Sequence, residues 1–216
     1  MQLISVNVAL PKVVNVQGRS VETGIFKRPV TGSVAVRALN LDGDRQADLS
    51  VHGGPDKALY VYSWTNVEFW RKFLRREDLD PGTFGENLTV DGLLDDEVAI
   101  GDQLKIGTAR FEVTQPRVPC FKLGIALGRP DFPKIFHRGG RNGFYLRVLE
   151  EGTIAAGDSI RTIPVANSEK MTIAEIAEVA RARTPKREAV ERAQKLRALS
   201  ESWKSWLREK LEARRS

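Results

Sequence analysis

The sequence contains a single cysteine, Cys120, in a setting that favours a reactive sulfur. Pro119 precedes it and biases the backbone there toward an extended conformation. The apolar residues that follow predict a short helix over 121–127, so the thiol lies at a helix N-terminus with Arg117 and Lys122 close in sequence. Such surroundings stabilise a thiolate, the form that attacks electrophiles or binds a soft metal. A buried, inert cysteine is the alternative, and the cysteine taken alone favours it.

A glycine-rich loop at residues 52–57, with the sequence HGGPDK, could hold an anion. Its glycine N–H groups are able to face a ligand, Lys57 adds a positive charge, and a helix expected over residues 57–76 adds a positive dipole end. His52 could donate to an oxyanion, act as an acid, or simply hold the loop. The GxxxxGK[ST] spacing of a Walker loop is absent, and a tight turn is the alternative.

Two further places offer polar groups to a ligand. Residues 137–143 form a second glycine-rich basic loop that contains Arg138 and Arg141. Asn87 can both donate and accept hydrogen bonds, which suits an amide-rich ligand such as a pterin, or the bracing of a loop.

The elements that must position these residues are mostly β-strands. Residues 109–114 alternate, with Phe111 and Val113 on one face, and lead directly to the cysteine. Other short apolar stretches separated by glycine turns predict a barrel. After residue 165 the pattern changes to three amphipathic helices, signalled by a capping box at Thr172, by Pro185 at a first helical position, and by the apolar stripe of 203–211. We therefore expect a barrel domain over 1–165 and a small three-helix bundle over 166–216.

Composition and charge limit the class of protein. The 216 residues are 41% hydrophobic, as in a globular protein, and one cysteine excludes an intramolecular disulfide framework. No stretch is long and apolar enough to span a bilayer and no signal peptide is present, so we expect a cytoplasmic protein with no membrane partner. The net charge is +6, and residues 165–216 carry most of it, with 13 Lys or Arg against 8 Asp or Glu. A basic tail permits contact with nucleic acid without requiring it.

Five motifs occur in an order that resembles the MOSC domain, the family named after the C-terminal domain of molybdenum cofactor sulfurase. They are HGGPDKA at 52–58, GENLT at 85–89, GDQLKIG at 101–107, PRVPC at 116–120 and GFYLRVL at 143–149. The helical tail resembles the extension of the YiiM-type branch. The resemblance implies a mostly β, barrel-like fold with a cysteine at the mouth of a pocket.

The same resemblance implies an activity and its cofactor. The cysteine that matches Cys120 ligates molybdenum held by a pyranopterin, the molybdenum cofactor, in related enzymes. The implied reaction is reduction of N-hydroxylated small molecules, notably 6-N-hydroxylaminopurine, to the amine. We therefore expect Cys120 and His52 to be catalytic and Cys120 to be the metal ligand, with the cofactor contacted by five residues: Lys57, Asn87, Arg117, Arg138 and Arg141.

Electrons for this reaction must come from a separate flavin or iron–sulfur protein, because the sequence carries no flavin, haem or iron–sulfur signature. We expect a monomer or homodimer. Two alternatives differ in class: a sulfur or persulfide carrier that uses Cys120, and an anion or nucleic-acid module that uses the basic tail. We disfavour the nucleic-acid partner because the third tail helix shows no base-reading face.

Overall fold

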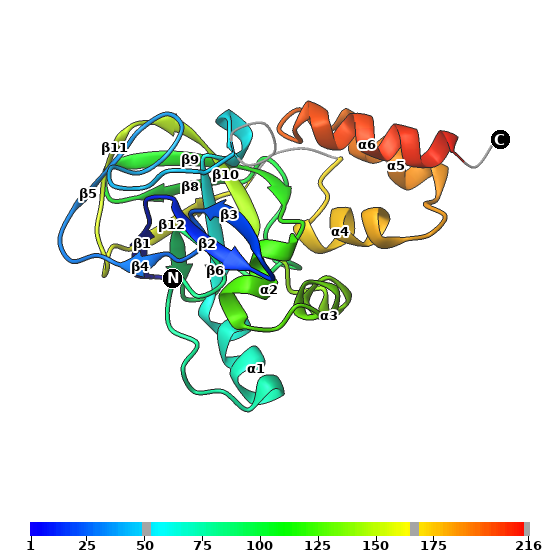
Figure 1. The fold of residues 1–216 in the computed structure, drawn as a ribbon. Coiled ribbons are helices and arrows are strands. Elements are labelled where there is room, and N and C mark those ends of the chain that lie inside the picture. Colours follow the sequence, from blue (N-terminus) through cyan, green and yellow to red (C-terminus); the bar gives the residue numbers. More distant parts are fainter. Residues whose placement is uncertain (49–52, 165–168, 214–216) are drawn as a thin grey trace.

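One large sheet, with helices gathered at one end of it, dominates the computed structural model (Figure 1), which describes residues 1–48, 53–164 and 169–213. The eight strands of the sheet follow one another in the order β12 (Ile160–Ile163), β8 (Gln103–Ile106), β9 (Ala109–Pro116), β10 (Phe144–Glu150), β6 (Leu59–Ser63), β7 (Leu88–Val90), β1 (Leu3–Val8) and β4 (Arg28–Pro29). All neighbours are antiparallel except β6 and β7, which pair in parallel. The chain is thus a mixed α/β protein.

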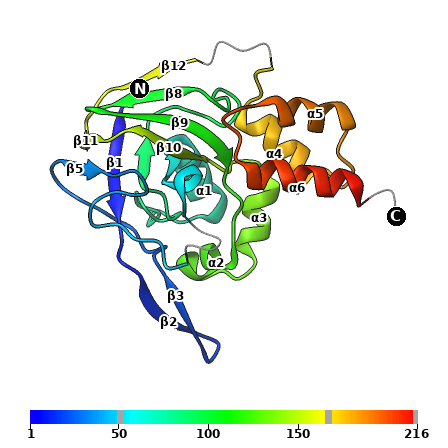
Figure 2. The ribbon, with the colours of Figure 1, turned by 90° about the horizontal axis from the view of Figure 1, so that it is seen from above.

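The barrel expected from the sequence is not confirmed. In the described part of the chain the large sheet is open, with β12 and β4 at its edges, although an isolated bridge joins Gln2 to Ser159. Two smaller sheets pair β5 (Val34–Val36) with β11 (Gly152–Ile154) and β2 (Lys12–Val16) with β3 (Arg19–Thr23). The β2–β3 hairpin projects from the body in Figure 2.

Six α-helices lie within the described residues: α1 (Trp64–Leu74), α2 (Phe121–Leu127), α3 (Phe132–Gly139), α4 (Ile173–Arg181), α5 (Arg187–Lys195) and α6 (Glu201–Glu212). The capping box at the start of α4 is confirmed, because Thr172 and Glu175 exchange hydrogen bonds. Pro185 was wrongly placed at a first helical position: α5 begins at Arg187, after the capping residue Lys186. No described helix has the length and apolar character needed to cross a membrane.

The helix expected over 57–76 is wrong in its first part. Residues Pro55–Lys57 form one 3₁₀ turn, Leu59–Ser63 form the strand β6, and α1 begins only at Trp64. Every residue of β6 is buried, and its sequence LYVYS is a largely apolar run without alternation, which periodicity cannot distinguish from a helix. Pairing with β7 and β10, both distant in sequence, decides the conformation.

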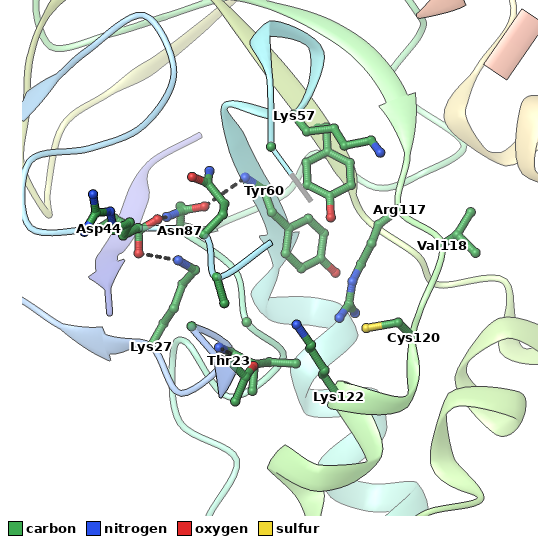
Figure 3. Close-up of a pocket in the computed structure, with 18 residues that line it drawn as sticks. Thr23, Lys27, Asp44, Lys57, Tyr60, Asn87, Arg117, Val118, Cys120 and Lys122 are labelled. Carbon is green, nitrogen blue, oxygen red and sulfur yellow. Dashed lines mark hydrogen bonds and ion pairs between the residues drawn. The ribbon is translucent and has the colours of Figure 1, made fainter. Parts of the chain in front are cut away.

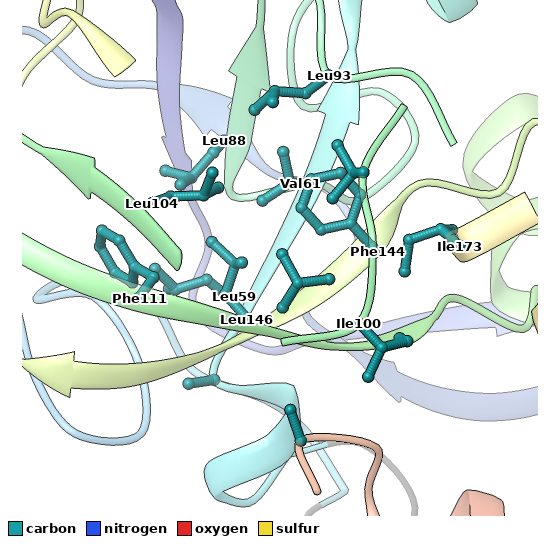
Figure 4. Packing of buried hydrophobic residues seen from close by; sticks show 14 of the residues in the cluster. Leu59, Val61, Leu88, Leu93, Ile100, Leu104, Phe111, Phe144, Leu146 and Ile173 are labelled. Carbon is teal, nitrogen blue, oxygen red and sulfur yellow. The ribbon is translucent and has the colours of Figure 1, made fainter. Parts of the chain in front are cut away.

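The hydrophobic core is shared between the sheet and the C-terminal helices. One continuous cluster contains inward residues of the strands together with residues of α4, α5 and α6. Figure 4 shows Ile173 of α4 beside Phe144 of β10, and Ile100 belongs to the same cluster. A second, aromatic cluster lies beneath α1, α2 and α3. The boundary expected between residues 165 and 166 lies outside the described residues.

Candidate functional site

A pocket brings together residues from seven separate parts of the described chain (Figure 3). They come from the end of β3, the 44–47 segment, the loop before β6, β6 itself, the segment before β7, the β9–α2 junction, and β10. The residues lining it are Thr23, Gly24, Ile25, Lys27, Asp44, Arg45, Gln46, Ala47, Gly53, Lys57, Tyr60, Gly85, Asn87, Arg117, Val118, Cys120, Lys122 and Tyr145. Of the seven residues predicted from the sequence, four meet here: Lys57, Asn87, Arg117 and Cys120.

Cys120 occupies the capping position of α2, as the sequence predicted. Its backbone is extended (φ −114°, ψ 173°), and its carbonyl oxygen accepts a hydrogen bond from the N–H of Leu123 at 3.0 Å. β9 ends at Pro116, and the Arg117 N–H donates to the Gly143 carbonyl at 3.1 Å, which fixes the strand exit against β10. The thiol is half-buried and faces the pocket (Figure 3). It cannot form an intramolecular disulfide, because the chain has no second cysteine.

Arg117 is a buried cation in the pocket wall. Only 6% of its surface is exposed, and its guanidinium lies over the rings of Tyr60 and Phe136 at 4.8 and 5.3 Å. Burial opposes its charge, but the neighbouring Tyr60, Tyr145 and Cys120 more than offset this and raise the pKa. No carboxylate among the described residues forms an ion pair with Arg117, and its Nη1 has no hydrogen-bond partner there. A buried donor left in this state is suited to an anion.

Lys57 adds a second cation, and the pocket as a whole is strongly positive. Burial lowers the pKa of Lys57, and the neighbouring Asp56 works against that shift. Among the described residues that line the pocket, five are cationic (Lys27, Arg45, Lys57, Arg117 and Lys122) and Asp44 is the one carboxylate. An anionic ligand would therefore be attracted.

Asn87 braces the pocket wall rather than presenting its amide to a ligand. Its Oδ1 accepts from the Tyr60 N–H at 3.1 Å, and its Nδ2 donates to Asp44 Oδ2 at 2.9 Å. Asp44 also forms a buried ion pair with Lys27. Burial lowers the pKa of Lys27, and the Asp44 charge resists this. Sequence reasoning missed Lys27 and Asp44, because no local pattern links residues so far apart.

Two predicted cofactor residues, Arg138 and Arg141, do not line this pocket. α3 continues through Gly139, so Arg138 is an exposed residue of its last turn rather than part of a loop. Arg141 donates from Nη1 to Asn66 Oδ1 at 2.9 Å and stacks over Phe69 at 4.2 Å, where it lines a separate cavity beside α1. His52 lies outside the described residues. The described residues contain no group of three or more His, Cys, Asp or Glu side chains arranged to hold a metal ion.

Comparison with known proteins identifies the family to which this fold belongs. The family model of the MOSC domain matches residues 48–161. The uncharacterized protein YflK of Bacillus subtilis is 40% identical over 94% of this chain and 91% of its own length. Protein YiiM of Escherichia coli is 34% identical over 73% of this chain and 70% of its own. A protein of Gibberella moniliformis named "Reductase" is 38% identical over 66% of this chain, but over only 26% of its own length.

A solved structure agrees with these sequence comparisons. The crystal structure of YiiM from Geobacillus stearothermophilus superimposes with a TM-score of 0.81 at 33% identity, covering 97% of this chain and 98% of that one. The family model spans more than half of the chain, including the β6, β9 and α2 segments that build the pocket. The chain therefore belongs to the MOSC domain family.

Proposed function

We propose that the protein is a molybdenum-cofactor-dependent reductase of N-hydroxylated compounds such as 6-N-hydroxylaminopurine, with Cys120 as its ligand to molybdenum. Membership of the MOSC family supports a molybdenum-cofactor-related function in general. The fungal relative named "Reductase" supports reduction as the type of reaction. The observation that carries the proposal is that the chain's one thiol and a buried guanidinium, whose Nη1 has no hydrogen-bond partner among the described residues, line the same cationic pocket.

The residues present fit the cofactor in charge and in donor chemistry. A dithiolene and a phosphate are anionic, and the orphaned Nη1 of Arg117 together with Lys57 supplies donors for them. A thiolate from Cys120 is a soft ligand that suits a metal with changing oxidation states. The cavity volume of the pocket is about 110 Å³, below the roughly 300–1,000 Å³ of typical ligand pockets. A pterin would accordingly extend into the open mouth.

When bound, the cofactor would supply two-electron oxygen-atom removal from the substrate. The overall change is R–NHOH + 2e⁻ + 2H⁺ → R–NH₂ + H₂O, so the N–O bond breaks and the oxygen leaves as water. The protein's own residues would bind and orient. Cys120 would hold the metal at the pocket wall, Arg117 and Lys57 would neutralise the anionic ligand, and the Lys27–Asp44–Asn87 network would keep the opposite wall in place.

The electrons would come from a separate flavin or iron–sulfur protein, as the sequence predicts. The chain carries no sequence signature of a flavin, haem or iron–sulfur site, so the proposed reaction needs an external source of electrons.

The proposal is tested by metal content and activity together. The protein is produced in a host with a complete molybdenum cofactor pathway, and molybdenum per chain is measured for wild type and Cys120→Ala. We expect the wild type to hold molybdenum and to reduce 6-N-hydroxylaminopurine with a reduced viologen dye, and the variant to do neither. Val118→Ala, on the same pocket wall, is the matched control and should retain both. Equal activity of Cys120→Ala and wild type would exclude the proposed role.

The same experiment separates the sulfur-carrier alternative. A persulfide carrier would also need Cys120, but it would show a sulfur atom added to the intact protein by mass spectrometry and would not retain molybdenum. Persulfide on the wild type without molybdenum or reductase activity would favour the carrier over the reductase.

A further inference from the structure

The helices α2 and α3 form a basic surface directly beside the pocket. Residues 118–141 contain five Lys or Arg and a single acidic residue, Asp131. Arg129 uses that carboxylate in an exposed ion pair at 2.6 Å. Lys122, Lys134 and Arg138 form no ion pair with any described residue. The segment therefore carries a net positive charge, whereas the other residues of 1–164 hold 16 Lys or Arg against 19 Asp or Glu.

Large apolar side chains are exposed on the same segment. Phe121, the first residue of α2, is 60% exposed, and Val118 is 47% exposed. They flank Cys120 in sequence on either side, and Val118 also lines the pocket (Figure 3). Exposed aromatic and aliphatic residues surrounded by charge are typical of a protein interface.

Packing contacts connect the α2–α3 segment to the pocket. Gly124 of α2 packs so closely on the α2–α3 turn that an added Cβ would meet the Arg129 carbonyl at 2.8 Å. Phe136 of α3 lies beneath the Arg117 guanidinium, so the underside of α3 forms part of the support of the site. A partner bound over α2 would contact Val118 and Phe121, which flank Cys120 in the sequence, and would therefore lie close to the thiol.

We infer that this α2–α3 surface, made of Val118, Phe121, Lys122, Lys134 and Arg138, is the docking site of an acidic electron-transfer protein carrying a flavin or an iron–sulfur centre. The inference rests on the proposed function, since a reductase with no redox centre of its own needs such a donor. An acidic rim on the donor meets the lysines and the arginine, and an apolar centre meets Val118 and Phe121. Docking here places the donor over the chain segment that carries the metal ligand.

A nucleic acid fits this surface less well. Duplex binding requires many phosphate contacts, and here three cations that form no ion pair with a described residue share the segment with two exposed apolar side chains. The apolar centre would remain exposed against a phosphate backbone. Protein docking buries it.

The test uses two electron sources with the molybdenum-loaded protein. Flavodoxin, an acidic flavin protein reduced by NADPH through its reductase, serves as the protein donor, and reduced methyl viologen serves as a small donor that needs no docking surface. The variant is Lys134→Glu/Arg138→Glu. The matched control is Lys105→Glu/Arg161→Glu, which reverses two exposed cations that face each other on β8 and β12. Phe121→Ser tests the apolar centre separately.

We expect Lys134→Glu/Arg138→Glu to raise the KM for flavodoxin ~10-fold and to weaken its dependence on salt, since rim charges act on association. Dye-driven turnover and molybdenum content should match the wild type, and the control should behave as the wild type throughout. Flavodoxin-driven rates that the variant leaves unchanged, or a wild type that flavodoxin cannot reduce while the dye can, would overturn the docking site. Loss of RNA or DNA binding with unchanged flavodoxin kinetics would assign the surface to nucleic acid and would also overturn it. Absence of dye-driven activity in the wild type would refute the reductase itself.

Discussion

Two buried ionisable residues, Arg117 and Asp95, show how single side chains prepare the site. Arg117 is a cation without a carboxylate partner among the described residues, held between aromatic rings. Asp95 is a buried carboxylate that accepts from the N–H groups of Asn142 (2.7 Å) and Gly143 (3.2 Å). Gly143 in turn accepts from the Arg117 N–H. The two residues therefore both anchor the backbone at Gly143, where β10 begins. Substitution of Arg117 should change anion binding, whereas substitution of Asp95 should change the pH dependence of stability.

Substitution of Arg117 should separate anion binding from folding. Lysine keeps the charge but loses the planar fork, and alanine loses both. A charge-assisted hydrogen bond is worth about 1.5–3 kcal/mol, or roughly ten- to a hundredfold in affinity. We expect molybdenum per chain to fall in the order wild type, Arg117→Lys, Arg117→Ala. If the residue only braced the loop, both variants would lower the melting temperature equally with and without cofactor, and molybdenum would stay constant.

The carboxyl of Asp95 should make folding stability depend on pH. Burial raises its pKa from 3.8 to about 6, although hydrogen bonds from Asn142 and Gly143 oppose the shift. The folded protein therefore binds this proton more tightly than the unfolded chain, so the free energy of unfolding falls as pH rises from about 4 to about 6. The contribution is on the order of 2–3 kcal/mol. Asp95→Asn should remove this slope in urea unfolding at pH 4, 5, 6 and 7. The exposed neighbour Asp96→Asn is the control, and an unchanged slope in Asp95→Asn would contradict the assignment.

At the scale of elements, the sequence correctly predicted the part of the site that is built from neighbouring residues, namely Cys120 and the helix that follows it. The helix after Cys120 is ended by Gly128 in the left-handed conformation, and both features follow from residues adjacent in the chain. The strand β6 was missed because Leu59–Ser63 is buried throughout and takes its conformation from distant strands. For the same reason the Lys27–Asp44–Asn87 network was missed and Arg141 was misplaced, since its position depends on Asn66 of α1.

The junction between α3 and β10 should be intolerant of any side chain at Gly143. This residue has φ +66°, and an added Cβ would clash with the Val61 carbonyl oxygen and with the Tyr62 ring. We expect Gly143→Ala to destabilise the fold by about 3 kcal/mol or more, because both backbone strain and overpacking act there. Gly157→Ala is the control: it has φ +95° with nothing within 4 Å of the added Cβ, so only the backbone penalty of about 1 kcal/mol applies. Equal melting temperatures for the two variants would show that the junction can relax.

At the scale of the whole molecule, the C-terminal helices stabilise the site without entering it. No described residue of α4, α5 or α6 lines the pocket. All three helices nevertheless contribute residues to the hydrophobic cluster that packs against the sheet. The link is made near α4, where the Ile173 N–H donates to Val98 and the Ile100 N–H donates to Met171. Because the core is continuous, a substitution that destabilises the C-terminal helices should also destabilise the strands.

This continuity predicts that sheet and tail unfold together. Ile173 is fully buried at the contact between α4 and the sheet, so Ile173→Ala should cost about 2–5 kcal/mol of stability. Ile163, at the end of β12, is 38% exposed, and Ile163→Ala should cost about 1 kcal/mol or less. Hydrogen exchange measured by mass spectrometry on peptides of β9 and α6 reports the two regions separately. We expect Ile173→Ala to accelerate global exchange in both peptides by a similar factor, because one cooperative unit loses the same free energy everywhere. Acceleration confined to α6, with β9 as slow as in the wild type, would instead show that the tail opens alone and that the pocket is stable without it.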